Sequence, residues 1–300
     1  MIAINRILCP VDFSDASRAA LDHAAALARR YEARLIALHV VPLVPSTLTF
    51  PPAISAATLE PISFDLFRDE LRRFVEPVAD LVPAETVVTS GDAARTILDQ
   101  ARTADADLLV LGTHGRSGFE RLVLGSVAEK VLRRAACPVL TVPPAAAHAP
   151  ATSRPPYRRI LCPVDFSTTS EQALRYALSL AEEAKARLMV LHVLEWFPEQ
   201  EIREHRHFDV PEYRRFLEED ARRRLSEAVP AEARAWCELV ERVACGKPYR
   251  EILRVAGEEG SDLIVLGVQG RGAVDVLLFG STANHVVRQA SCPVLTVRRR

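Results

Sequence analysis

The chain opens with short apolar runs that alternate with amphipathic stretches. Residues 7–11 form a continuous apolar run, which is typical of a strand buried in a parallel sheet. After Ser14, apolar residues recur at helical spacing, and the Ser14 hydroxyl can cap that helix. The alternation continues and predicts further strands at 34–41, 86–89, 107–111 and 138–142, and further helices at 64–81, 93–104 and 127–135.

A segment rich in proline interrupts this alternation. Residues 42–64 hold five prolines together with many Ser, Thr and Ala residues, so we expect a loop there. Elsewhere strands and helices alternate, which favours parallel strand pairing with helices on both faces of the sheet. The pattern therefore predicts an α/β domain within the first half of the chain.

The second half repeats the first. The nine residues 6–14 return unchanged as residues 159–167, an offset of 153. Residues 137–142 return unchanged as 292–297, an offset of 155. Each unit is domain-sized, so the chain is a duplicated domain with a net insertion of two residues, and a short-period solenoid is excluded. We expect domains at 1–143 and 157–300, joined by a Pro/Ala-rich linker at 144–156.

Composition excludes several classes of protein. The chain has 38 basic and 39 acidic residues, without the basic excess expected of a nucleic-acid-binding protein. No segment approaches the ~20 apolar residues needed to span a bilayer, and no signal peptide precedes Asp12. We therefore expect a cytoplasmic protein without a membrane or nucleic-acid partner. The terminal run Arg298–Arg300 is interpreted as a solvated tail.

Six cysteines do not resemble a secreted disulfide framework. Four of them lie in apolar runs and are expected to be small core residues: Cys9, Cys137, Cys162 and Cys292. The other two belong to the second half alone and lie near two histidines. Whether Cys237, Cys245, His205 or His207 bind a metal stays open, because close Cys-x-x-Cys spacing is absent and no metal ligand is predicted.

The candidate chemistry lies at the carboxyl ends of predicted strands, where open α/β sheets bind ligands. Asp12 follows the first strand and Val40 ends the second. After the fourth strand comes the motif Gly-x2-Gly-x9-Gly-Ser, formed by Gly112, Gly115, Gly125 and Ser126. The second copy repeats every position as Asp165, Val193, Gly267, Gly270, Gly280 and Ser281.

These residue types suit a nucleotide. Glycines let the backbone approach a ligand closely, and their N–H groups can surround an anion. Ser126 opens the fourth helix, whose N-terminus offers unpaired N–H groups to phosphate. Asp12 is an acceptor at neutral pH and suits ribose hydroxyls or an adenine amino group. Val40 would offer its backbone to an adenine edge.

Two common nucleotide motifs are excluded. The pattern Gly-x4-Gly-Lys-Ser/Thr is absent, and neither loop holds a lysine. The glycines follow the fourth strand rather than the first, so they do not form the dinucleotide fingerprint.

Simpler interpretations compete with this one. Asp12 could cap the following helix, although its combination with Val40 and the glycine motif favours a ligand. His39 and His192 are expected to be core histidines bonded to backbone. Arg116 and Arg271 each follow a motif glycine, and whether they reach phosphate or solvent stays open.

The chain resembles a tandem universal stress protein over nearly all of both halves. The Pro-Val-Asp-Phe-Ser start, the Leu-His-Val strand end and the Cys-Pro-Val-Leu-Thr-Val finish match that family. The most specific signal is Gly-x2-Gly-x9-Gly-Ser, which marks the members that bind ATP, and both copies satisfy it. Within it, His114 in the first copy corresponds to Gln269, at positions that tolerate variation.

The resemblance implies an α/β fold with two repeated five-stranded parallel sheets, Rossmann-like or flavodoxin-like, each a three-layer α/β/α unit with strand order 3-2-1-4-5. It implies that Asp12 and Asp165 contact the nucleoside and that the backbones of Val40 and Val193 contact adenine. The phosphates would be surrounded by Gly112, Gly115, Gly125, Ser126, Gly267, Gly270, Gly280 and Ser281.

The function that the resemblance implies is an ATP-binding regulator of the stress response without efficient catalysis. The two halves would pair through their fifth strands, each holding one ATP, with or without Mg²⁺, and no catalytic residue is assigned. The alternative is a slow ATPase or an autophosphorylating protein. The absence of a lysine from both loops argues against this alternative. The protein partner and the association of two chains into a homodimer stay open.

Overall fold

The computed structural model describes residues 2–42, 64–113, 124–146, 157–195, 210–268 and 279–298. The predicted loop at 42–64 lies outside these residues except at its two ends, as do Gly115, Gly270, Arg116, Arg271, His205 and His207. The first half contains β1 (Arg6–Pro10), α1 (Asp15–Tyr31), β2 (Arg34–Pro42), α2 (Phe64–Ala79), β3 (Ala84–Gly91), α3 (Ala93–Thr103), β4 (Leu108–Gly112), α4 (Ser126–Arg134) and β5 (Val139–Val142).

The second half repeats this order after a short 3-10 helix, η2 (Pro144–Ala146). Its elements are β6 (Arg159–Pro163), α5 (Thr168–Ala184), β7 (Arg187–Leu194), α7 (Val210–Ala228), α8 (Ala233–Trp236), β8 (Leu239–Cys245), α9 (Pro248–Glu258), β9 (Leu263–Gly267), α10 (Ser281–Gln289) and β10 (Val294–Val297). The predicted alternation of strands and helices is confirmed in both halves.

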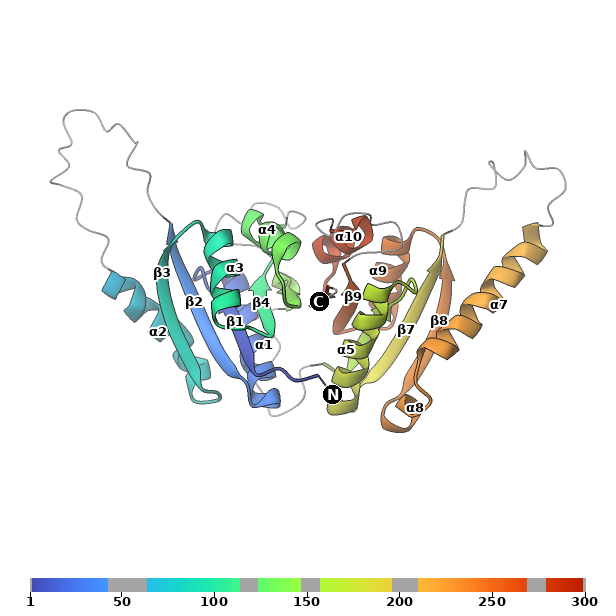
Figure 1. Ribbon diagram of the computed structural model, residues 1–300, viewed down its shortest axis with the longest axis horizontal. Helices are drawn as coiled ribbons and strands as arrows, with labels where there is room; N and C mark the ends of the chain where they lie inside the picture. Colours follow the sequence, from blue (N-terminus) through green and yellow to red (C-terminus); the bar gives the residue numbers. More distant parts are fainter. Residues whose placement is uncertain are drawn as a thin grey trace, which may run out of the picture.

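The described strands all join one ten-stranded sheet in the order β3-β2-β1-β4-β5-β10-β9-β6-β7-β8 (Figure 1). Within each half the pairing is parallel and the order is 3-2-1-4-5, so the predicted fold class is confirmed. The halves meet where β5 pairs antiparallel with β10, with Leu140 opposite Leu295. Two equivalent threonines reinforce this junction, because Thr141 Oγ1 donates to the Val294 carbonyl and Thr296 Oγ1 to the Val139 carbonyl.

Helices cover both faces of the sheet and enclose two cores. Helices α1, α2, α5 and α7 pack on one face, and α3, α4, α9 and α10 on the other. Neighbouring strand residues point to opposite faces, so Ile7 and Cys9 belong to the first core while Leu8 belongs to the second. Each core runs through both halves, which ties the duplicated units into one body.

The third strand is longer than the sequence indicated. Residues 86–89 were expected, and β3 spans Ala84–Gly91, because all eight residues pair with β2. As an edge strand it is only partly buried, so its ends carry polar residues that weaken the apolar signal. The other boundaries differ from expectation by a few residues at most.

The cysteine interpretation is confirmed where the structure describes it. Cys9, Cys137, Cys162 and Cys292 are buried and free. Burial raises the pKa of the Cys9 and Cys162 thiols, which makes them poor nucleophiles. Cys237 and Cys245 are half-buried, and the described residues contain no group of three or more His, Cys, Asp or Glu that could hold a metal.

The solvated-tail interpretation is wrong for Arg298. This residue is half-buried, and its Nη2 donates to the Leu132 carbonyl of α4 at 2.7 Å. Burial lowers the pKa of its guanidinium. The tail interpretation failed because β5 and β10 pair, which brings the residue after β10 onto a helix of the first half. None of the described helices combines the length and the apolar character needed to cross a bilayer.

Candidate functional site

Three of the predicted site positions meet at one edge of the sheet in each half. Strand β1 lies between β2 and β4, and all three run parallel, so their carboxyl ends lie side by side. Asp12 follows β1, Val40 lies near the end of β2, and Gly112 ends β4. The chain leaves β1 toward β2 and returns on its other side at β4, which makes this edge a topological switch point.

The second half places its copies in the same way. Asp165 follows β6, Val193 lies near the end of β7, and Gly267 ends β9. The four residues Asp12, Val40, Asp165 and Val193 are half-buried, so each is partly accessible from this edge.

Asp12 closes a tight turn with Ser14. Asp12 Oδ1 accepts hydrogen bonds from the Ser14 backbone N–H at 3.1 Å and from Ser14 Oγ at 2.5 Å. Phe13, between them, has a left-handed backbone with φ of 64°. The second half repeats the turn, with Ser167 bonded to Asp165 at 3.0 and 2.5 Å and Phe166 at a φ of 61°.

The helix cap is Ser14 rather than Asp12. Ser14 Oγ accepts from the Ser17 backbone N–H, and Ser167 does the same for Ser170. The capping interpretation of Asp12 is therefore wrong, and its Oδ2 accepts no hydrogen bond from the described residues. Sequence reasoning missed the support that Ser14 gives to Asp12, although the repeated Asp-Phe-Ser sequence, an Asx-type turn, is a signal for it.

The two histidines hold the strand ends in register. His39 is buried, and its Nδ1 lies 2.8 Å from the Val11 carbonyl, while its ring packs on Phe13 at 4.5 Å between centroids. His192 is also buried, 2.7 Å from the Val164 carbonyl. Because a carbonyl only accepts, Nδ1 carries the hydrogen. The expectation of core histidines bonded to backbone is confirmed.

The glycine at the end of the fourth strand permits a close approach. A β-carbon on Gly112 would lie 2.8 Å from the carbonyl carbon of Ala16, in the first turn of α1. A β-carbon on Gly267 would lie 2.8 Å from the carbonyl carbon of Thr169 in α5. The end of β4 therefore touches the helix that begins at the Asp12 turn, and the same holds in the second half.

The two ends of the glycine motif are joined by a hydrogen bond. The Gly125 N–H donates to the Thr113 carbonyl at 2.8 Å, and the Gly280 N–H donates to the Val268 carbonyl at 2.7 Å. Helices α4 and α10 therefore begin directly beside the ends of β4 and β9. The motif residues between, including Gly115 and Gly270, lie outside the described part of the chain.

Helices α4 and α10 begin without a side-chain cap. Gly125 and Gly280 occupy the cap positions, and Ser126 and Ser281 follow them on the exposed surface. By contrast, α1, α3 and α5 are capped by Ser14, Asp92 and Ser167. Within the described part of the chain, no side chain at the cap position accepts from the first N–H groups of α4 and α10, and an anion suits them because of the helix dipole.

Comparison with known proteins agrees with this arrangement. The model of the universal stress protein family matches residues 3–143 and again residues 156–298. The chain belongs to the universal stress protein family. It carries two copies of the family's domain, and the predicted resemblance is confirmed.

The relatives include a protein of the same tandem length. A universal stress protein of Mycolicibacterium smegmatis is 29% identical over 304 residues, covering 98% of this chain and 97% of that protein. One from Methanocaldococcus jannaschii is 36% identical over 142 residues, 46% of this chain and 81% of that protein. The crystal structure of a universal stress protein from Archaeoglobus fulgidus shares the fold, with a TM-score of 0.65 and 23% identity over 100% of both chains.

Proposed function

We propose that this universal stress protein binds one adenine nucleotide, ATP, in each half and acts as a nucleotide-dependent regulator of the stress response. The binding units are residues 1–143 and 157–300, joined by the linker 144–156. The observation that supports this most is the uncapped start of α4 and of α10 beside a switch point of the sheet. Such a helix start binds phosphate through its backbone.

Each site residue has a role suited to its position. Asp12 and Asp165 would accept hydrogen bonds from the sugar hydroxyls, and the bonds from Ser14 and Ser167 fix the orientation of each carboxylate. The backbones of Val40 and Val193 would contact the adenine edge. The phosphates would lie against Gly112, Gly115, Gly125 and Ser126 in the first half and against Gly267, Gly270, Gly280 and Ser281 in the second. A Mg²⁺ ion would be held mainly by phosphate oxygens and water.

The proposed role is binding rather than catalysis. Phosphoryl transfer needs charged groups placed at the γ-phosphate. Of the described side chains assigned to the site, the carboxylates belong to the nucleoside end, and the phosphate end offers a serine and backbone. Binding would then shift the population of protein conformations, which a protein partner could recognise.

Substitution of the motif serines tests the proposal without weakening the fold. Ser126→Asp places a carboxylate at the N-terminus of α4, where it repels phosphate but stabilises the helix. We expect the number of nucleotides bound per chain to fall from two to one, and to zero in Ser126→Asp/Ser281→Asp. Both variants should melt no lower than the parent protein. Ser226→Asp, on the exposed side of α7, is the matched control and should leave both sites intact.

The measurements are calorimetric titration with ATP and identification of the nucleotide released on denaturing purified protein. The proposal fails if the parent protein binds no adenine nucleotide, or if the double variant binds two. Incubation of bound ATP with Mg²⁺ for hours distinguishes a nucleotide-binding regulator from an ATPase. Intact ATP supports a regulator, whereas multiple turnovers that both serine substitutions abolish would support the ATPase alternative.

A further inference from the structure

Helix α4 of the first half is held at both ends by arginines of the second half. Arg288, in the last turn of α10, places Nη2 3.3 Å from Oε2 of Glu129, in the first turn of α4. Arg298, just after β10, donates through Nη2 to the Leu132 carbonyl in the last turn of α4. Figure 1 shows α4 and α10 facing each other across the junction of the halves.

This arrangement has no counterpart on α10. The offset of 155 places Asn284 where the first half has Glu129, and Arg298 where the first half has Pro143. Asparagine carries no charge and proline has no donor, so these positions cannot form the same contacts in reverse. Among the described residues, arginines of the second half therefore contact α4 of the first half, and the first half makes no equivalent contacts with α10.

Glu129 is shared by two equivalent arginines. Arg133 corresponds to Arg288 at the same offset, and its Nη2 lies 3.0 Å from Glu129 Oε1. The side chains of Glu129 and Arg288 are 32% and 35% exposed, so solvent screens this contact less than a pair on the open surface. One carboxylate thus lies between a guanidinium of its own half and one of the other.

The contact between Arg288 and Glu129 affects how well an anion binds at the start of α4, because Glu129 lies in the first turn of that helix. An acidic residue in the first turn stabilises the helix dipole, but it repels a phosphate at the same end. The two guanidinium groups offset that repulsion. Arg298 acts at the other end of α4, where a cation stabilises the last carbonyl groups.

We propose that Arg288 and Arg298 are positioning residues of the first-half site, which makes its affinity for phosphate depend on the second half. This inference rests on the proposed function, since it concerns the nucleotide at the start of α4. The second-half site has no such dependence on the first half. The two sites of one chain therefore differ in affinity, although their motifs are the same.

Each site can be titrated alone, because Ser281→Asp leaves the first site and Ser126→Asp leaves the second. In the Ser281→Asp background, Arg288→Gln should weaken ATP binding about threefold, the size expected of a partly exposed ion pair. In the Ser126→Asp background it should leave the affinity unchanged. Arg134→Gln is the matched control, because it removes a cation from the exposed side of α4. It should weaken binding less than Arg288→Gln.

Rescue separates a charge effect from general loosening of the fold. Arg288→Lys should restore most of the affinity. Glu129→Gln combined with Arg288→Gln should restore it as well, because no uncompensated carboxylate remains. Arg298→Gln should weaken the first site and speed amide hydrogen exchange in α4, with the second site unaffected.

The inference is overturned if Arg288→Gln weakens both sites equally, if it weakens neither, or if removing Glu129 brings no rescue. The proposed function fails separately. If the parent protein and both single-site backgrounds bind no ATP, the function itself is wrong. If they bind as expected and the arginine substitutions do not act on the first site, only the coupling is wrong.

Discussion

Gly112 and Ala16 lie so close together that no side chain fits between them. A β-carbon on Gly112 would lie 2.8 Å from both the carbonyl carbon and the carbonyl oxygen of Ala16. Gly112→Ala should force the end of β4 away from α1. We expect a loss of about 1–3 kcal/mol in unfolding free energy, together with weaker ATP binding in the first half. Denaturant unfolding and titration in the Ser281→Asp background measure the two effects.

Gly257 supplies the control for that substitution. It lies exposed within α9, and a β-carbon there would meet nothing within 4 Å. Gly257→Ala should therefore stabilise the protein by about 0.5–1 kcal/mol through helix propensity. An equal loss of stability in both variants would contradict the role given to the close approach.

Ser14 supports both α1 and Asp12. Ser14→Ala removes the cap of α1 and the Oγ hydrogen bond to Asp12 Oδ1, while the bond from the backbone N–H remains, so we expect a loss of about 1 kcal/mol in stability and weaker binding in the first half. Asp92→Ala removes the cap of α3 alone, where Asp92 accepts from the Arg95 N–H. It should cost similar stability and leave ATP affinity unchanged. If both variants weaken binding alike, Asp12 does not depend on its serine.

His23 links the two described ends of the linker region. Its Nδ1 lies 3.0 Å from the Tyr157 hydroxyl, and its Nε2 lies 3.4 Å from the Ala146 carbonyl. The neutral ring with hydrogen on Nε2 satisfies both partners, because the carbonyl only accepts and the hydroxyl can donate. Burial lowers the pKa of His23, and the hydrogen bond to Ala146 opposes that effect.

Acid should therefore destabilise the fold at this point. A histidine with a lowered folded pKa contributes its full stability above the unfolded pKa of about 6.5, and loses it as the pH falls below that value. His23→Gln keeps a donor and an acceptor but cannot be protonated. Thermal melts between pH 7.5 and about pH 5 should show a smaller acid loss in this variant than in the parent protein.

Other ionisable groups lie near His23, so the comparison must be made between variants. Tyr157 faces the ring, with Asp262 and Cys292 near the Tyr157 hydroxyl, and Asp22 precedes His23 in α1. These groups are present in both proteins and cancel in the difference. A parallel pH profile for His23→Gln would refute the assignment.

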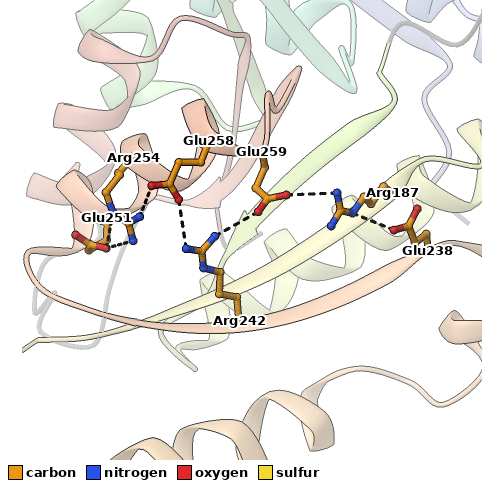
Figure 2. A network of polar contacts seen from close by, with 7 residues as sticks. All are labelled: Arg187, Glu238, Arg242, Glu251, Arg254, Glu258 and Glu259. Atoms are coloured by element: carbon orange, nitrogen blue, oxygen red, sulfur yellow. Dashed lines mark hydrogen bonds and ion pairs between the residues drawn. The ribbon is translucent and has the colours of Figure 1, made fainter.

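A chain of ion pairs crosses the outer part of the second half (Figure 2). Arg242 on β8 contacts Glu258 and Glu259 at 3.3 Å, and Arg187 on β7 contacts Glu259 at 3.3 Å and Glu238 at 3.1 Å. Since Arg242 joins two carboxylates, Arg242→Ala should lower stability by about 1 kcal/mol, and less in 1 M salt. Urea unfolding at low and high salt measures this.

Arg72 is the matched control for Arg242. It forms an exposed pair with Asp69 at 3.5 Å within α2, so Arg72→Ala should have little effect at either salt concentration. Equal effects of the two substitutions would show that the network adds nothing beyond a single surface pair. The first half has Val87 and Thr103 where the second has Arg242 and Glu258, so it lacks these partners.

The sequence specified the elements because their signals are local. The apolar run at residues 7–11 and the helical spacing after Ser14 each reflect burial within one element. The duplication then confirmed each assignment a second time. The weakest prediction was β3, whose burial depends on one neighbouring strand, so its sequence alternates less clearly.

Several relationships depended on contacts between distant segments. Arg298 looked like part of a solvated tail, and it caps α4 because β5 and β10 pair. His23 gave no signal of its own, and its partners lie 123 and 134 residues away. Such contacts are decided by how the halves dock, which no local periodicity encodes.

The amino-acid sequence alone determined that there are two copies of an α/β unit and which residue types stand at the ends of its strands, because periodicity and repetition are properties of the chain. Tertiary structure decided which of those ends meet, that Ser14 supports Asp12, and that Glu129 faces Arg288 of the other half. The reason is physical. Identical motifs acquire different surroundings once one sheet is continued through an antiparallel junction, and charges at that junction need not be repeated in both copies.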